Sequence, residues 1–219
     1  QGETFTSKEA TEVFFAVTKL FQNKDANLRR MVYLIIREMS PGSDEVIIVT
    51  SSLMKDMTSN NPLFQANAIR VLSSIIDSSL LQQIERFFKS SVVSKDENVA
   101  SAALVAGLRL APYNIDIIKR WASEVQEAVQ SRHPMVQAHA VALLHKLRQS
   151  DRLAVSKLVT TLTRGSVRSS MAQCLLVRYV SQVIRETQGQ MGEARPSTTI
   201  SSNACGTSLT WSSSRLLAL

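Results

Sequence analysis

One stretch of the sequence decides the fold: residues 136–148 read VQAHAVALLHKLR. Its apolar residues recur at three- and four-residue steps, namely Val136, Ala140, Leu143, Leu144 and Leu147. Side chains at these spacings lie on one side of an α-helix, because positions three and four apart stack above one another. The stretch is therefore predicted to be a helix that buries one apolar stripe.

The same pattern occurs five times along the chain. Its equivalent anchor positions are spaced 36, 35, 37 and 35 residues apart: Leu28, Phe64, Val99, Val136 and Met171. Four residues after each anchor stands a small or apolar residue: Val32, Ala68, Ala103, Ala140 and Leu175. A fixed period of this length with helical spacing inside it is typical of an α-solenoid. Such a fold predicts an extended binding surface rather than an active site.

Each repeat is expected to contain two helices joined by a short turn. The first helices are predicted over residues 28–39, 64–76, 99–110, 136–148 and 171–185. The second helices begin near acidic residues, which favour a helix N-terminus: Asp44, Glu45, Asp77, Asp116 and Asp151. The β-branched run at residues 46–50 would be read as a strand in isolation, but the repeat places it in a second helix.

The two ends of the chain have their own signatures. Thr6 and Glu9 match a capping box, which predicts a helix over residues 7–22. Residues 188–219 hold seven Ser and four Thr without a helical stripe, so this tail is predicted to be disordered. The predicted domains are thus an α-solenoid over residues 1–187 and a non-homologous Ser/Thr-rich tail over residues 188–219.

Composition narrows the class of protein. The chain is 44% hydrophobic and 20% charged, which is typical of a globular protein. Its apolar runs fall short of the roughly 20 residues that a membrane-spanning helix needs. The net charge of +7 is spread thinly, without a run of five basic residues, and so does not name an anionic partner by itself.

The sequence lacks the patterns of metal sites and catalytic sites. His133, His139 and His145 are six residues apart, about 240° around a helix, so they do not share a face. Cys174 is expected to pack as a small hydrophobic residue, and with Cys205 it gives no CxxC pair. A Gly-rich phosphate loop, HExxH and GxSxG are absent. No catalytic, metal or cofactor-binding residue and no small-molecule substrate is predicted.

Long uninterrupted phrases resemble one family closely. They are residues 10–21 (ATEVFFAVTKLF), 28–34 (LRRMVYL), 45–57 (EVIIVTSSLMKDM) and 151–158 (DRLAVSKL). From residue 1 to about 196 the chain is similar to the N-terminal trunk of the coatomer gamma subunits, the large chains of the COPI vesicle coat. The resemblance implies an adaptin-like trunk of HEAT/armadillo-type helix pairs.

The resemblance also implies function. It predicts a structural subunit of the COPI coatomer in intracellular protein transport between Golgi and endoplasmic reticulum. The implied partners are the zeta, beta and delta coatomer subunits and an Arf-family GTPase in its GTP form. The implied location is cytoplasmic and peripheral on Golgi membranes and COPI vesicles.

The family sequences also extend further at both ends. They continue before the phrase at Gln1 and beyond Pro196, so we expect a missing N-terminal portion and a frame change or alternative exon near Pro196.

Basic residues near helix ends are the candidate contacts with the GTPase or an anionic membrane: Arg29, Arg30 and Lys55. The alternative function is a karyopherin-like or regulatory scaffold that binds a cytosolic protein. Nucleic-acid binding rests on net charge alone and is not favoured. A steep fall of affinity with salt would mark it.

Overall fold

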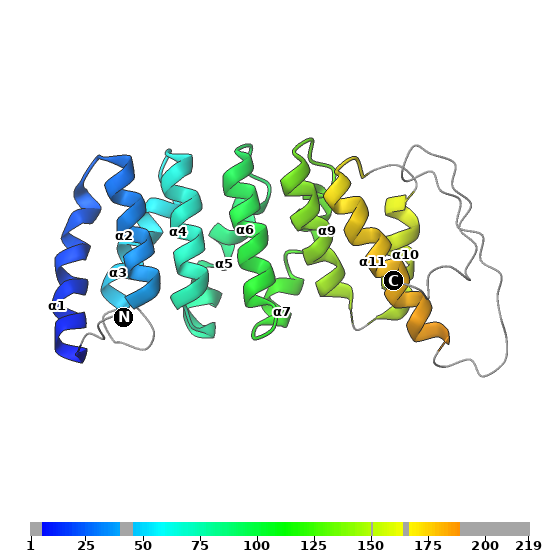
Figure 1. The fold of residues 1–219 in the computed structure, drawn as a ribbon, viewed down its shortest axis with the longest axis horizontal. Helices are drawn as coiled ribbons and strands as arrows, with labels where there is room; N and C mark the ends of the chain where they lie inside the picture. Colours follow the sequence, from blue (N-terminus) through cyan, green and yellow to red (C-terminus); the bar gives the residue numbers. More distant parts are fainter. Residues whose placement is uncertain (1–5, 40–45, 150, 164–166, 189–219) are drawn as a thin grey trace, which may run out of the picture.

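The computed structural model describes residues 6–39, 46–149, 151–163 and 167–188, and every regular element in these ranges is a helix. The first helices are α2 (Ala26–Met39), α4 (Pro62–Ile75), α6 (Glu97–Leu110), α9 (Pro134–Arg148) and α11 (Ser170–Gln188). The second helices are α3 (Val46–Met57), α5 (Ser78–Val92), the pair α7 (Ile115–Lys119) and α8 (Ala122–Ala128), and α10 (Arg152–Thr163). Ahead of them, α1 (Ser7–Thr18) continues into the 3₁₀ turn η1 (Lys19–Gln22). The predicted all-α solenoid is confirmed (Figure 1).

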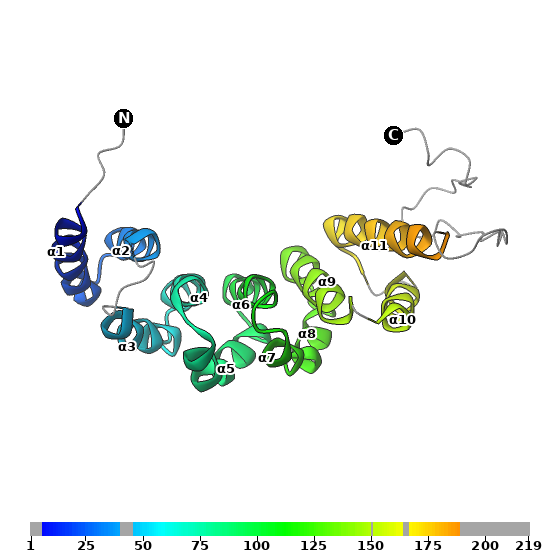
Figure 2. The same ribbon diagram turned by 90° about the horizontal axis from the view of Figure 1, so that it is seen from below.

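The helix pairs stack into a curved array. Figure 2 shows the first helices side by side on the concave side of the arc and the second helices on the convex side. Successive first helices pack directly against one another, α2 on α4, α4 on α6, α6 on α9 and α9 on α11. Each repeat therefore shares its core with its neighbours, as solenoids do.

The helix starts follow the capping chemistry of the sequence. The backbone N–H of Thr6 donates to the Glu9 carboxylate at 2.9 Å, and the Glu9 N–H donates to the Thr6 hydroxyl at 3.4 Å, which confirms the capping box. Asp77 accepts from the Leu80 N–H at 2.8 Å. The β-branched run lies in α3, as predicted, where Val49 is buried against the neighbouring helices.

The fifth repeat corrects the predicted register by one residue. Met171 is 62% exposed, whereas Ala172 and Leu176 are fully or nearly fully buried. The buried pair therefore begins at Ala172, 36 residues after Val136. Burial decides the register here, because the i and i+4 positions of a first helix must both face the core.

The second helix of the third repeat is broken in two. It was predicted as one helix from Asp116, but α7 ends at Lys119 and α8 starts at Ala122. Trp121 lies at the break with no exposed surface, stacked on Phe88 with ring centroids 5.8 Å apart. Gly107 of α6 leaves room for Leu143 and for this ring, since a Cβ there would stand 2.7 Å from the Leu143 side chain and 3.3 Å from the indole. The break between α7 and α8 thus coincides with the burial of this ring.

The predicted packing of Cys174 is also wrong. It was predicted to pack as a small hydrophobic residue, but it is an exposed free cysteine. The buried stripe of α11 runs through Ala172 and Leu176, and Cys174 lies two positions from each, about 200° around the helix. The tail predicted over residues 188–219 falls, except for Gln188 at the end of α11, outside the described residues, and the predicted boundary stays a prediction.

Candidate functional site

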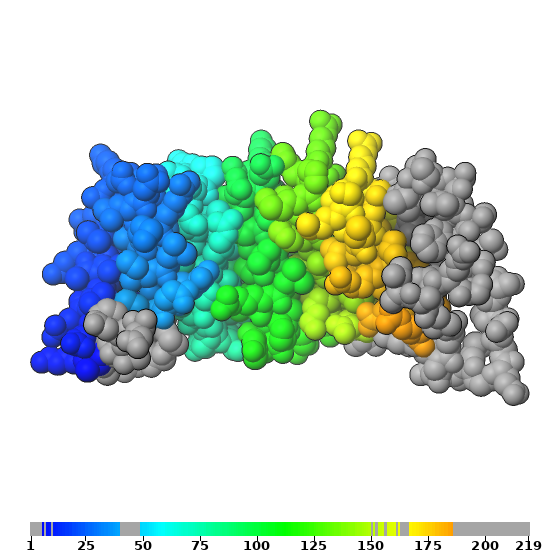
Figure 3. Space-filling model, viewed as in Figure 1, coloured from blue at the N-terminus to red at the C-terminus, as the bar shows by residue number. Residues whose placement is uncertain are grey.

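Several exposed apolar side chains belong to the first helices, which form the concave side of the array. In the described part of the chain, eleven large hydrophobic residues are exposed, and six belong to first helices: Met31, Leu34, Val105, Met135, Met171 and Val177. Figure 3 shows this face as space-filling atoms. Apolar side chains gathered on one face of a protein mark a contact surface for a partner. The concave face is therefore the candidate functional site.

An open groove lies between α2 and α4. Its volume is about 460 Å³. It is lined by Arg30, Tyr33, Leu34, Arg37, Pro62, Leu63, Ala66, Asn67, Arg70, Val71 and Asn98. Three of these described lining residues are arginines and none is acidic. The groove combines an apolar floor with positive charge, and Arg is enriched at the energetic centres of interfaces.

The three arginines differ in how well their charge is balanced. Arg37 forms an ion pair with its neighbour Glu38 at 2.7 Å. Arg30 and Arg70 instead donate to the neutral Asn27 and Asn67 side chains, at 3.3 and 3.1 Å. Burial lowers the pKa of Arg70, as expected for a partly desolvated cation beside a neutral partner. A negatively charged group placed in the groove would meet Arg70 and Arg30 directly.

Arg29, a predicted surface contact, is buried instead and is only 5% exposed. Its guanidinium forms an ion pair with Asp56 of α3 and donates to the Phe21 carbonyl. It also donates to the Tyr33 hydroxyl at 2.8 Å and lies 4.4 Å from the ring centroid of Phe64. The prediction that Arg29 faces a partner is therefore wrong. Its side chain ties η1, α2, α3 and α4 together.

The charge cluster around Arg29 is stabilised internally. Burial acts to lower the pKa of Arg29, but hydrogen bonds with Asp56 and Tyr33 outweigh it and raise that pKa. Burial raises the pKa of Tyr33, whose hydroxyl donates to Asp56 at 2.8 Å. The cation therefore stays charged in the core.

The other two predicted contacts are exposed but lie apart. Arg30 lines the groove on α2. Lys55 is exposed in the last turn of α3, in the convex row of helices, and does not line the groove. The structure thus brings Arg30 together with Arg37 and Arg70, which the sequence did not single out. Their partner-binding roles remain proposals.

The histidines each have a separate environment. His133 pairs with Glu97, His139 lies 2.9 Å from the Ser101 hydroxyl across α6 and α9, and His145 stacks on Tyr179. Within the described residues, no group of three His, Cys, Asp or Glu side chains is placed to hold a metal. In the same ranges, no helix is long and apolar enough to cross a membrane.

His139 is expected to make stability fall on acidification. Burial lowers the pKa of His139 below its ordinary value, so the unfolded chain takes up this proton at a higher pH than the folded chain. The free energy of unfolding therefore decreases as the pH falls below about 6.5, the pKa of His in the unfolded chain. Urea unfolding at neutral and mildly acidic pH should show a smaller loss for His139→Gln than for the unchanged chain. Equal losses would contradict this assignment.

The sequence contained a signal for the groove that repeat alignment alone did not use. Leu34 and Val105 occupy the same position, six residues after their anchors, and both are exposed, as is Arg70 at that position of the second repeat. An apolar residue recurring at a position outside the buried stripe indicates a contact face. Arg37 and Asn98 carry no comparable signal, because single polar residues on a helix surface are ordinary.

Comparison with known proteins places the chain in a family. The model of the adaptin N terminal region matches residues 1–200. The chain belongs to the adaptin N-terminal region family. It is 67% identical over 197 residues to coatomer subunit gamma-2 of Oryza sativa subsp. japonica, which covers 90% of this chain and 22% of that protein.

Two further relatives are also coatomer gamma subunits. Coatomer subunit gamma of Arabidopsis thaliana is 67% identical over 195 residues, 88% of this chain and 22% of the relative. Coatomer subunit gamma of Dictyostelium discoideum is 55% identical over 187 residues, 85% of this chain and 21% of the relative. The chain thus spans about a fifth of the length of these relatives. Within the adaptin family it resembles the coatomer gamma branch.

Proposed function

We propose that the chain is the trunk segment of a COPI coatomer gamma subunit and acts as a structural component of the vesicle coat in transport between Golgi and endoplasmic reticulum. The observation that carries this proposal is the 67% identity to coatomer gamma over nine-tenths of the chain. Its solenoid supplies the extended surface that a coat subunit needs to contact several partners at once. No catalytic role is proposed.

The partners follow from the same proposal. Other coatomer subunits, with zeta, beta and delta as the specific candidates, would contact the trunk, and an Arf-family GTPase in its GTP form would recruit it to Golgi membranes from the cytoplasm. The concave groove is the docking position that suits the GTPase best. It offers exposed Leu34 beside Arg30 and Arg70, a combination typical of the central contacts of protein interfaces.

A pull-down with GTP-locked and GDP-locked Arf-family GTPase tests this function. We expect recovery of the chain only with the GTP-locked form. The double variant Arg30→Ala/Arg70→Ala should weaken binding at least about tenfold, since removing interface arginines commonly costs that much. Arg86→Ala, compared with each single variant Arg30→Ala and Arg70→Ala, is the control for loss of one positive charge, because Arg86 is exposed on α5 in the convex row.

The outcomes separate the proposed function from its alternative. Equal recovery with both nucleotide forms would contradict the coat proposal and favour a karyopherin-like or regulatory scaffold. GTP-dependent recovery that Arg30→Ala/Arg70→Ala leaves unchanged would keep the coat function but move the docking position away from the groove. In that case Lys55→Ala tests the remaining exposed candidate.

A further inference from the structure

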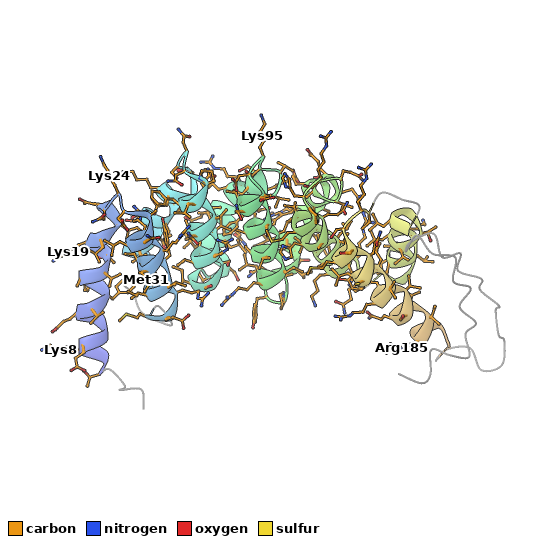
Figure 4. The ribbon with its side chains drawn as sticks, turned by 45° about the horizontal axis from the view of Figure 1, so that its top comes forward. Lys8, Lys19, Lys24, Met31, Lys95 and Arg185 are labelled. Carbon is orange, nitrogen blue, oxygen red and sulfur yellow. The ribbon has the colours of Figure 1, made fainter. Side chains whose placement is uncertain are left out.

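The first helices all run in the same direction across the solenoid. Figure 4 places Lys24 and Lys95, which precede α2 and α6, at one edge, and Arg185, near the end of α11, at the opposite edge. Helix α4 packs between α2 and α6 and belongs to the same row. Equivalent residues of α2 and α4 therefore stand at the same level on the two walls of the groove.

The groove has cations at two levels, one on each wall. Arg70 of α4 is equivalent to Leu34 of α2, since each stands six residues after its anchor, and Arg30 stands four residues earlier. At 1.5 Å per residue, the backbone positions of Arg30 and Arg70 are about 6 Å apart along the helix axes. Among the ion pairs of the described residues, none includes either arginine. Each guanidinium has five N–H donors, so it can still receive a carboxylate.

The acidic side chains beside the lining residues are directed elsewhere. Glu38 pairs with Arg37 at 2.7 Å. Glu97, which precedes the lining residue Asn98, contacts Nδ1 of His133 in the following repeat at 2.5 Å, on the side of α6 that faces α9 rather than α4. No acidic residue is among the described residues that line the groove. The space between α2 and α4 is therefore positive.

An apolar strip lies beside the two cations. Leu34 is 48% exposed at the level of Arg70, while Ala66 and Val71 of α4 line the groove from buried positions. A small inorganic anion would leave this strip in contact with water. A ligand that matches the groove therefore needs apolar side chains beside its negative charges.

We propose that the groove binds an amphipathic helix of a partner protein that carries two carboxylates four residues apart on its apolar face. In such a helix, residues i and i+4 lie on one face and are about 6 Å apart along the axis, which matches the levels of Arg30 and Arg70. Apolar residues at i+3 and i+7 cover Leu34, as in other helix-in-groove complexes. The choice of a protein partner rests on the proposed coat function, whose docking position this inference deepens.

Fluorescence anisotropy with two dye-labelled peptides tests the spacing. Each is an Ala-rich peptide of about 20 residues, long enough to form a helix in water. The matched peptide has two Glu four residues apart and a Leu three residues after each. In the shifted peptide the second Glu exchanges places with an Ala two positions earlier, about 200° around the helix from the first Glu. We expect the full chain to bind the matched peptide about threefold more tightly, the effect of one additional surface ion pair.

The variant Arg30→Gln/Arg70→Gln should weaken binding of the matched peptide about tenfold, about threefold for each ion pair removed, and should bind both peptides equally. The matched control Arg109→Gln/Arg178→Gln removes the same charge from exposed arginines of α6 and α11 that do not line the groove. We expect its affinity to stay within about twofold of the unchanged chain, since distant surface charges are screened. Circular dichroism should show equal helix content in both variants.

Two results would overturn the proposal: equal affinity of the unchanged chain for the two peptides, and equal losses in the groove variant and the control variant. The GTPase pull-down is a separate readout. GTP-dependent recovery without discrimination between the peptides would strike this inference alone. Discrimination between the peptides without GTP-dependent recovery would remove the GTPase as the partner and keep the groove as a site for an acidic helix.

Discussion

Replacing Arg29 with Ala is expected to lower the free energy of unfolding by about 3–5 kcal/mol, the usual cost of removing one partner of a buried ion pair. The change leaves the Asp56 carboxylate, 13% exposed, without its cation. It also removes the donor to the Phe21 carbonyl and the cation that lies over the Phe64 ring. Four elements lose a shared contact at once, so the first two repeats should loosen together.

Urea unfolding followed by circular dichroism measures this effect. Arg30→Ala is the matched control, because the neighbouring arginine is exposed and should change stability by no more than about 0.5 kcal/mol. The stability of Arg29→Lys should lie between that of Arg29→Ala and that of Arg30→Ala. Lys keeps the positive charge, but its ammonium group cannot reproduce the planar guanidinium fork. The double variant Arg29→Ala/Asp56→Ala should cost less than the sum of the single variants, because the second change removes the unpaired charge. Equal stability of Arg29→Ala and Arg30→Ala would refute the argument.

Arg29 also shows what the repeat pattern did not reveal. The residue after the anchor is Arg29, Gln65 and Gln137 in three repeats, and Gln173 follows the corrected position Ala172. Each donates to a backbone carbonyl of the preceding segment, Gln65 to Ser59 at 2.6 Å, Gln137 to Val129 at 2.9 Å and Gln173 to Val167 at 3.2 Å. The position therefore ties the start of a first helix to the turn before it, and a long donor there is buried, as Arg29 and Gln137 are, or half-buried, as Gln65 and Gln173 are.

The side chains at this position differ in the number of segments to which they form hydrogen bonds. Gln137 donates to Val129 and also accepts from the backbone N–H groups of Arg168 and Ser169, at 2.9 and 2.7 Å. It thus joins three consecutive segments from a position that is 3% exposed. Such contacts depend on where the preceding turn ends in space. Sequence spacing gives the position of the donor but not the carbonyl that it meets.

The fold was predictable because the first helices share one sequence pattern, with a small or apolar residue at the same position of each repeat. Small residues such as Ala68, Ala103 and Ala140 recur at the position where neighbouring first helices approach, and all three have no exposed surface. The site was less predictable, because a groove needs two helices to be placed side by side. Arg70 and Leu34 are 36 residues apart in the sequence, and only stacking brings both to one groove.

Replacing Trp121 with Ala is the second change with a large expected effect. The free energy of unfolding should fall by about 3–5 kcal/mol, the range for truncating a fully buried aromatic side chain. The indole stacks on Phe88 of α5 and donates to the Glu85 carboxylate at 3.2 Å. It also fills the space above Gly107 of α6. Its removal would leave a cavity where three helices meet, at the break between α7 and α8.

Tyr113→Ala provides the matched control for this measurement, because Tyr113 is an aromatic residue of the preceding turn and is 86% exposed. Its loss should change stability by no more than about 0.5 kcal/mol. Trp121→Phe keeps part of the ring volume but not the N–H donor, and it should cost less than Trp121→Ala. If Trp121→Ala unfolds at the same urea concentration as Tyr113→Ala, the indole does not fix the break in the second helix. The interruption between Lys119 and Ala122 would then need a cause within the backbone of that segment.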